Sequence, residues 1–409
     1  MKRLWRSPTL RSVAVYGAAG AGFAVANLIL ARVLPPSEYA VVTLVMALLN
    51  IGFFIAPAGL DGVVNRRPLE AGPRLLGRAA VPAAIAGVAL GAIAAGAYDT
   101  PAGLTAMTLI SVVAGGLLTV AAAQFQSEHR FGPSLALLQS INFLLLLAAV
   151  LTVASGVRRA ELVFLVVTAG TVIGAVWGWA VLFRERRAKP HRSVEVPWNE
   201  AFAFAGMQAA GLILIQLERL MLPHLLPLEA LATYGVLAAV AGSLFRVLQM
   251  GVGYSLLPRL RGAANLQQRR RLLAREARLV GAIVVAGSAA IIVIVPLVER
   301  WFLAGKYHLA GPLVLATVVA GVAKLVTALA KAAATALATP GELSLANLVG
   351  WLSLGIAAGG IVIGARWGLA GVIYGGALGW LVRAVTFGVI SARHLRQPVA
   401  PVTQAVNVP

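Results

Sequence analysis

The sequence predicts an all-α polytopic membrane protein with about twelve transmembrane helices. Three observations predict this class. Hydrophobic residues make up 60% of the 409 residues and charged residues only 12%, more apolar surface than a soluble protein could bury. The apolar residues form about twelve runs of roughly 20 residues, the length that crosses a hydrocarbon core about 30 Å thick. The basic residues behind the net charge of +20 lie mostly in loops, as in membrane proteins.

The apolar runs define the predicted helices in chain order. The first run is too long for the core of a signal peptide, and Arg32, Pro35 and Pro36 follow in place of a small-residue cleavage site. Later runs contain Pro57 and Pro296, which membrane helices tolerate better than soluble ones. We expect helices at residues 13–34, 40–60, 79–97, 104–124, 134–155, 162–183, 201–222, 231–257, 279–298, 310–333, 343–363 and 368–390.

The distribution of Lys and Arg predicts the orientation. With these helices, 24 of the 34 basic residues fall on the side of the N-terminus, six fall on the other side, and four lie within helices. Because cytoplasmic loops of membrane proteins are enriched in Lys and Arg, both termini are predicted to be cytoplasmic. The expected location is the cytoplasmic membrane, which the chain crosses many times.

A basic linker and a weak internal repeat divide the chain into two halves. Residues 1–183 are expected to form an N-terminal six-helix bundle, 184–200 a basic cytoplasmic linker, 201–392 a C-terminal six-helix bundle, and 393–409 a cytoplasmic tail. The stretch from Leu34 to Ala40 (LPPSEYA) recurs in part from Leu226 to Gly235 (LPLEALATYG). Two halves of six helices each point the same way and would be related by an axis along the membrane normal, with a central cavity between them.

Several stretches resemble the polysaccharide-biosynthesis flippases, which include O-antigen and exopolysaccharide flippases. The segment from Asn27 to Ala40 is similar to the first hairpin of that family, and QLERLMLP from Gln216 to Pro223 is similar to its seventh helix. Thr233-Tyr-Gly and Leu257-Pro-Arg-Leu resemble the ends of its eighth helix. Ala40 departs from the family, in which Gly is commoner after the tyrosine. The family belongs to the superfamily of lipid II flippases and multidrug and toxin extrusion antiporters.

The resemblance implies a fold, a substrate and partners. The fold would be antiporter-like, with a central cavity. The substrate would be an oligosaccharide linked to a polyprenyl diphosphate, moved from the inner to the outer leaflet. Membrane lipids would surround the chain, and a polysaccharide polymerase and glycosyltransferases are possible partners. One chain would suffice, without a cofactor.

Charges within the predicted helices point to an anionic substrate. Arg219, Arg246, Lys324 and Arg383 lie in apolar runs, and Glu218 is the acidic residue well inside one. A charge at the bilayer centre costs about 2.5–3.5 kcal/mol on insertion scales, so such residues usually face a cavity or a partner. A net positive cavity suits an anion because a low-dielectric cleft focuses the field.

Helical periodicity extends this set of candidate residues. The residues Thr317, Lys324, Thr327, Lys331 and Thr335 share one helix face. We expect Arg246, Lys324, Arg219, Arg383, Gln249, Gln208 and Thr327 to bind the substrate, and Arg66, Arg67 and Lys331 to line its entrance. Three alternatives stay open. Lys331 could reach the membrane surface, Arg219 could pair with Glu218, and Arg66 with Arg67 could be topogenic charges near lipid headgroups.

The sequence also argues against several other functions. The chain has no cysteine and only five scattered histidines, so we expect no thiolate chemistry and no metal site. No catalytic residues and no Walker lysine motif are found, and the basic charge lies in loops rather than in a nucleic-acid-binding patch. A cation-coupled multidrug antiporter would need a carboxylate deep in the first six helices, which is lacking. A non-transporting scaffold of a polysaccharide assembly complex, or a role as a lipid II flippase, remain alternatives.

Overall fold

The computed structural model describes residues 8–66, 69–186, 195–261, 263 and 265–396. These residues form α-helices and no strand, which confirms the predicted fold class. The first half contains α1 (Pro8–Val33), α2 (Pro36–Ile55), α3 (Leu60–Arg66), α4 (Pro73–Tyr98), α5 (Ala102–Ser127), α6 (Phe131–Ser155) and α7 (Ala160–Arg186). The second half contains α8 (Trp198–Leu225), α9 (Leu228–Arg261), α10 (Leu266–Leu297), α11 (Gly311–Leu337), α12 (Pro340–Gly364) and α13 (Gly368–Arg396).

Most of these helices can span a bilayer. Within the described residues, nine stretches are long and apolar enough to cross a membrane, and one of them, Ser344–Leu395, contains both α12 and α13. The described parts of α1 and α9 add two further apolar stretches, Gly17–Val33 and Leu228–Ser243. Together these segments agree with the prediction of about twelve membrane helices.

Several helix boundaries differ from the sequence-based expectation, and two of the differences have a clear local cause. The predicted helix 40–60 ends at Ile55, because Ala58 and Gly59 adopt positive φ angles of 49° and 79° and turn the chain into α3. The helix predicted at 279–298 begins at Leu266, after an N-cap in which the Asn265 side chain accepts a hydrogen bond from the backbone N–H of Gln268. The basic Arg269–Arg271 run therefore lies within α10.

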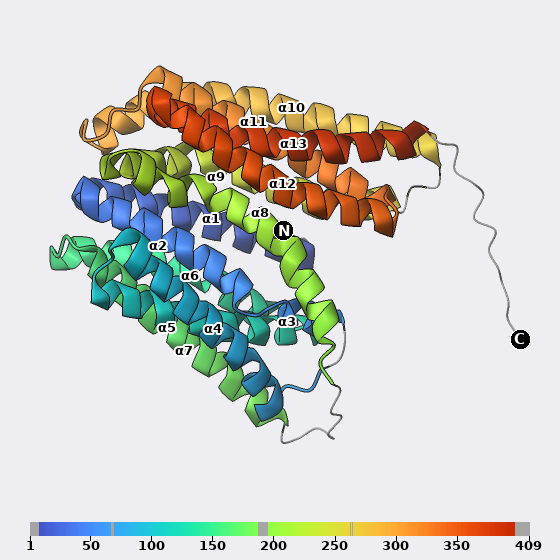
Figure 1. Cartoon of the computed structure of the whole chain (residues 1–409), viewed down its shortest axis with the longest axis horizontal. Helices are drawn as coiled ribbons and strands as arrows, with labels where there is room; N and C mark the ends of the chain where they lie inside the picture. The colour runs from blue at the N-terminus through green and yellow to red at the C-terminus, as the bar shows by residue number, and fades with distance from the viewer. Residues whose placement is uncertain (1–7, 67–68, 187–194, 262, 264, 397–409) are drawn as a thin grey trace, which may run out of the picture.

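The helix-packing pattern of the first half recurs in the second. In the first half α1 packs on α6, α2 and α4 on α5, and α7 on α5 and α6. In the second half α8 packs on α12, α9 and α10 on α11, and α13 on α11 and α12. Among the described residues some contacts differ: α5 packs on α6 without a comparable contact between α11 and α12, and α8 packs on α13 without one between α1 and α7. The two halves thus form bundles that share their main contacts (Figure 1).

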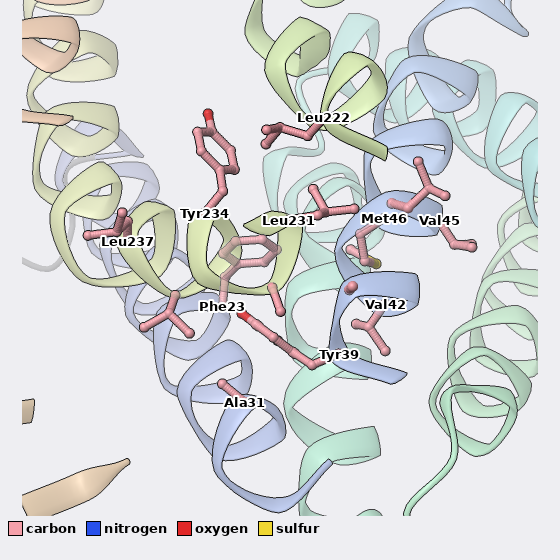
Figure 2. Packing of buried hydrophobic residues seen from close by; sticks show 14 of the residues in the cluster. Phe23, Ala31, Tyr39, Val42, Val45, Met46, Leu222, Leu231, Tyr234 and Leu237 are labelled. Carbon is pink, nitrogen blue, oxygen red and sulfur yellow. The ribbon is translucent and has the colours of Figure 1, made fainter. Parts of the chain in front are cut away.

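The two bundles meet through their first two membrane helices. Helix α1 packs on α9, while α2 packs on α8 and α9. Figure 2 shows this shared core, to which α2 contributes Tyr39 and Val42 and α9 contributes Leu231 and Tyr234. Gly235 allows the close approach, because a Cβ there would lie 2.5 Å from the Thr43 hydroxyl oxygen. The repeated tyrosines Tyr39 and Tyr234 are both buried at this interface.

The chain crosses repeatedly between two ends of the molecule. We call the end where α1 begins and α13 ends the basic end, and the other the opposite end. The bundles lie together at the opposite end and diverge toward the basic end (Figure 1). The motif from Asn27 to Ala40 forms the first hairpin at the opposite end. Within it, Tyr39 donates a hydrogen bond to the Asn27 side chain at 3.3 Å, and Glu38 accepts one from the backbone N–H of Ala160 at 2.7 Å.

The loop between α10 and α11 ties the bundles together at the opposite end. Lys306 donates hydrogen bonds to the backbone carbonyls of Ala31 and Leu34 at the end of α1. The Tyr307 hydroxyl donates to the Ala31 carbonyl at 3.1 Å. Burial, together with the positive charge of Arg158, lowers the pKa of Lys306. These bonds satisfy carbonyls that a helix end would otherwise leave unpaired.

A second link at the opposite end joins α4 to α8. The Tyr98 hydroxyl donates a hydrogen bond to the Leu220 carbonyl at 2.9 Å. Its ring centroid lies 4.9 Å from that of His224, in a tilted stack. Because Tyr98 belongs to the first bundle and His224 to the second, this contact also holds the bundles together at the opposite end.

Candidate substrate-binding site

A polar cluster lies within the helices of the second bundle, well away from their ends. Lys324 is the central residue of α11, while Glu218 comes from α8, and Trp380 and Arg383 come from α13. The residues come from three helices far apart in sequence, and they meet because α11 and α13 pack closely and α8 packs against α13. We call Glu218, Lys324, Trp380 and Arg383 the mid-helix cluster.

Lys324 and Glu218 form the ion pair of this cluster. The Lys324 Nζ lies 3.8 Å from the Glu218 Oε1. The Glu218 side chain is 1% exposed, whereas the Lys324 side chain is 23% exposed. Lys324 also lies above the Trp380 ring, with its Nζ 5.8 Å from the ring centroid. The carboxylate is therefore enclosed, and its ammonium partner retains contact with open space.

Arg383 is held mainly by α12. Its Nε donates a hydrogen bond to the Ser353 hydroxyl at 2.8 Å, and its Nη2 donates to the Gly350 carbonyl at 3.0 Å. The guanidinium carbon lies 6.0 Å from the Trp380 ring centroid. On its other side a Cβ built at Gly211 of α8 would approach Nη1 at 3.4 Å. The positive charge of Arg383 thus has neutral partners, and it adds to that of Lys324.

Arg219 points away from its neighbour Glu218. Its Nη1 donates to the Gln216 side chain at 2.6 Å, and its guanidinium carbon lies 5.9 Å from the Tyr234 ring centroid. The side chain is 8% exposed and its Nε has no hydrogen-bond partner among the described residues. The alternative Glu218–Arg219 pair is therefore not formed: Glu218 faces Lys324, and Arg219 faces α9 at the bundle interface.

The threonines of the predicted polar stripe on α11 make structural hydrogen bonds. Thr327 was expected to bind the substrate, but its side chain is buried and its hydroxyl bonds the Trp380 carbonyl at 2.7 Å, joining α11 to α13. Thr317 and Thr335 bond carbonyls one turn earlier on their own helix. A threonine can satisfy its hydroxyl within its own helix, so its spacing alone does not show that it faces water.

The predicted entrance residues lie toward the basic end. Arg66 is exposed, with its Nη1 3.6 Å from the Glu200 Oε1 and its guanidinium 4.9 Å from the Phe204 ring centroid. These contacts join α3 of the first bundle to the start of α8. Lys331 is exposed on α11. Arg67 lies outside the described residues.

The remaining predicted residues lie on α8 and α9. Gln208 is half-buried on α8. Arg246 and Gln249 fall on α9, but their side chains lie outside the part of the chain that the structure describes.

Some residues of the site were not predicted from the sequence. Trp380 of the cluster, and Ser353 that accepts a hydrogen bond from Arg383, carry no charge and therefore do not stand out in an apolar run. Gly376 also belongs to the site, because a Cβ there would lie 2.6 Å from the Glu218 Oε1. The described residues contain no group of three His, Asp or Glu side chains that could hold a metal ion. The cluster and Arg219 together carry three cations and one carboxylate, an arrangement that can attract and hold an anion.

The fold matches solved transporter structures over most of the chain. One is an inward-facing multidrug resistance MATE family transporter of the MOP superfamily, with a TM-score of 0.62, 13% identity, and coverage of 92% of this chain and 94% of that chain. Another is the lipid II flippase MurJ in an inward closed conformation, with a TM-score of 0.60, 11% identity, and coverage of 92% and 86%. The chain has the fold of MOP superfamily transporters.

A third structure with the MOP fold agrees with this assignment. It is a variant of the Vibrio cholerae MATE transporter VcmN, with a TM-score of 0.51, 14% identity, and coverage of 94% of this chain and 95% of that chain. No protein-family model and no curated protein matches the sequence. The MOP fold is shared by multidrug transporters and a lipid flippase, so the nature of the substrate has to be argued from the chemistry of the site.

Proposed function

We propose that the chain is a flippase that moves a polyprenyl-diphosphate-linked oligosaccharide across the cytoplasmic membrane. The observation that carries this proposal is the excess of cations within the helices of the second bundle. Lys324 pairs with the carboxylate Glu218, whereas Arg383 and Arg219 have neutral hydrogen-bond partners. This arrangement is suited to an anion and unsuited to a cationic drug, which the same field would repel.

The energetics of burying charge support an anionic substrate. Each cation within a membrane helix costs about 2.5–3.5 kcal/mol on insertion scales, and such residues are usually functional. A diphosphate that leaves water needs new donors for its oxygens, and an ammonium and a guanidinium supply them. Lys324 and Arg383 flank the same Trp380 ring, so both could reach one diphosphate. The glycan would then lie between the bundles, with the prenyl tail in the bilayer.

The direction of transport follows from the orientation. Arg66, Arg74, Arg78 and Arg130 mark the end that we assign to the cytoplasm. The bundles are tied at the opposite end through Lys306 and Tyr98, so the described conformation is suited to loading from the cytoplasm. Rocking of the bundles around the cluster would then deliver the substrate outward. We propose that glycosyltransferases act before this step and a polysaccharide polymerase acts after it, as partners of the chain.

Mass spectrometry of polyprenyl-linked sugars tests this function. Deleting the gene should cause a complete oligosaccharide to accumulate on its diphosphate lipid, and the wild-type gene should restore the normal level. Lys324→Ala and Arg383→Ala should fail to restore it at normal membrane abundance. Arg366→Ala is the matched control, because Arg366 is exposed between α12 and α13. An unchanged lipid-linked pool in the deletion strain argues instead for cation export or a scaffold role.

A further inference from the structure

Glu218 is a buried carboxylate that the proposed transport step does not use directly. We propose that Glu218 is a built-in counter-anion, which pairs with Lys324 in the empty transporter and is replaced there by the substrate's diphosphate. This inference rests on the proposed function, because it assumes that Lys324 binds an anion. It assigns to Glu218 the role of a positioning residue that sets how tightly the anion is held.

The geometry around Glu218 fits a partner that can be exchanged. Its Oε1 lies 3.8 Å from the Lys324 Nζ, which is longer than a direct hydrogen bond. Its Oε2 is buried and has no hydrogen-bond partner among the described residues. Charged groups that are fixed permanently inside proteins usually have their hydrogen bonds satisfied. This carboxylate has charge compensation but few directional bonds.

A close-fitting site keeps the carboxylate in place when its partner leaves. Gly376 of α13 faces Glu218, and a Cβ at that position would lie 2.6 Å from Oε1 and 3.0 Å from the carboxyl carbon. Glycine therefore makes room for the carboxylate against α13. Lys324, by contrast, has a flexible four-carbon stem and is 23% exposed. The ammonium is the member of the pair that can move toward an incoming anion.

The other cations near the cluster are paired differently. Arg383 of α13 donates to Ser353 and Gly350 of α12, and Arg219 donates to Gln216 within α8. These partners are neutral, so substrate binding needs to displace no carboxylate from either arginine. Among the described side chains of the cluster, the exchange of one anion for another is therefore confined to Lys324.

Such an exchange has a consequence for the transport cycle. A flippase must return to its loading conformation without substrate, and an unpaired buried ammonium would be costly during that return. Glu218 would neutralise Lys324 in the empty state. When the substrate binds, the diphosphate must compete with Glu218, so binding is weaker than three cations alone would allow. The weaker binding favours release on the far side of the membrane.

Binding of a soluble probe to the purified full-length chain tests this role. The probe is farnesyl diphosphate, which carries the diphosphate and a short prenyl chain, and farnesol is the uncharged control. Glu218→Gln keeps the shape of the side chain and removes its charge. We expect it to bind farnesyl diphosphate roughly tenfold more tightly than wild type, as removing a competing buried charge should, and to transport more slowly. Farnesol binding should not change.

Further variants separate this inference from the proposed function. Lys324→Met should lose most farnesyl diphosphate binding, and Glu218→Gln combined with Lys324→Met should behave like Lys324→Met alone. Glu229→Gln is the matched control, because Glu229 is exposed in the first turn of α9. If Glu218→Gln does not fold, Glu218→Asp serves as the second variant. It keeps the charge on a shorter side chain, and it should show a smaller gain in affinity for farnesyl diphosphate.

The outcomes are distinct. Unchanged or weaker binding in the folded Glu218 variants, with binding lost in Lys324→Met, overturns the counter-anion role and leaves the anion site standing. If Lys324→Met binds the probe as wild type does, the anion site itself is wrong, and with it the counter-anion role.

Discussion

Two adjacent residues of α8, Glu218 and Arg219, contact different neighbouring helices. Glu218 faces Lys324 in the second bundle, while Arg219 faces Tyr234 at the interface between the bundles. Neighbours on a helix are about 100° apart, so one short motif can supply both a counter-anion within a bundle and a cation between bundles. The Gln216–Arg219 stretch therefore links the site to the surface along which the bundles would move.

The individual charges could be predicted from the sequence, but their pairing could not. Arg219, Lys324 and Arg383 stand out because charged residues are rare in apolar runs. The Glu218–Lys324 pair depends on how α8 packs against α13 and how α13 packs against α11. Residue spacing within one helix contains no information on such contacts. Thr327 illustrates the limit, because helical spacing placed it beside Lys324 while its hydroxyl bonds α13.

Glycines between α12 and α13 provide a residue-scale prediction of stability. A Cβ at Gly375 would lie 2.2 Å from the Gly360 carbonyl oxygen, so Gly375→Ala must push two backbones apart. Overpacking of this kind costs about 1–3 kcal/mol. Gly359→Ala is the control, because a Cβ there meets nothing within 4 Å. Unfolding of the purified protein in mixed detergents should show the lower stability of Gly375→Ala, and equal stability of the two variants would contradict this packing.

At the scale of elements, the contacts at the opposite end hold the two bundles together, and we call these contacts the closure. Lys306 and Tyr307 bind carbonyls of α1, and Tyr98 binds the end of α8. Transport by alternating access requires these contacts to separate. The apolar runs predicted where the helices lie, but they could not show these contacts. The reason is that the bonds join residues more than a hundred positions apart through backbone carbonyls.

A cross-link across this closure should stop transport. The chain has no cysteine, so Tyr98→Cys with His224→Cys gives a single reactive pair at rings 4.9 Å apart. A short thiol-specific cross-linker should block transport, and a reductant that cleaves the link should restore it. Each single cysteine variant treated with the same reagent is the control. Transport that continues at the control rate after complete cross-linking would show that the opposite end does not need to open.

The basic end carries a pH-sensitive contact between α12 and α13. Glu342 accepts a hydrogen bond from the backbone N–H of Thr339, and its Oε2 lies 2.7 Å from the Nε2 of His394. The Thr339 bonds and the His394 contact lower the pKa of Glu342 from 4.5 to about 2. A carboxyl group whose pKa is lowered by folding stabilises the fold at pH values above its ordinary pKa of 4.5. This contribution is lost as the pH falls toward 2.

The dependence of stability on pH should reveal this contact. Between about pH 5 and pH 3, the wild-type protein should lose more thermal stability than Glu342→Gln, which has no carboxyl group to protonate. Glu229→Gln, at an exposed position in α9, should lose as much as wild type. Parallel melting curves for wild type and Glu342→Gln across this range would contradict the assignment.

At the scale of the whole molecule, two similar bundles carry an asymmetric set of charges. The main packing contacts of α1, α2 and α4–α7 recur in α8–α13, yet the mid-helix cluster lies in the second bundle. The weak repeat around Tyr39 and Tyr234 was the sequence signal for two bundles. The boundaries 1–183 and 201–392 remain a proposal for how the chain divides into moving units. On this view the first bundle moves against a second bundle that holds the anion.

The measurement that most directly tests transport of a diphosphate-linked glycan uses reconstituted vesicles. These would contain the purified chain and the polyprenyl-diphosphate-linked oligosaccharides extracted from its host. Periodate added outside, under conditions in which it does not cross the bilayer, oxidises only glycans that reach the outer leaflet. We predict that wild-type protein exposes the inner-leaflet glycans to oxidation, whereas Lys324→Ala and protein-free vesicles leave them protected. An equal protected fraction in all three preparations would contradict the proposed flippase function.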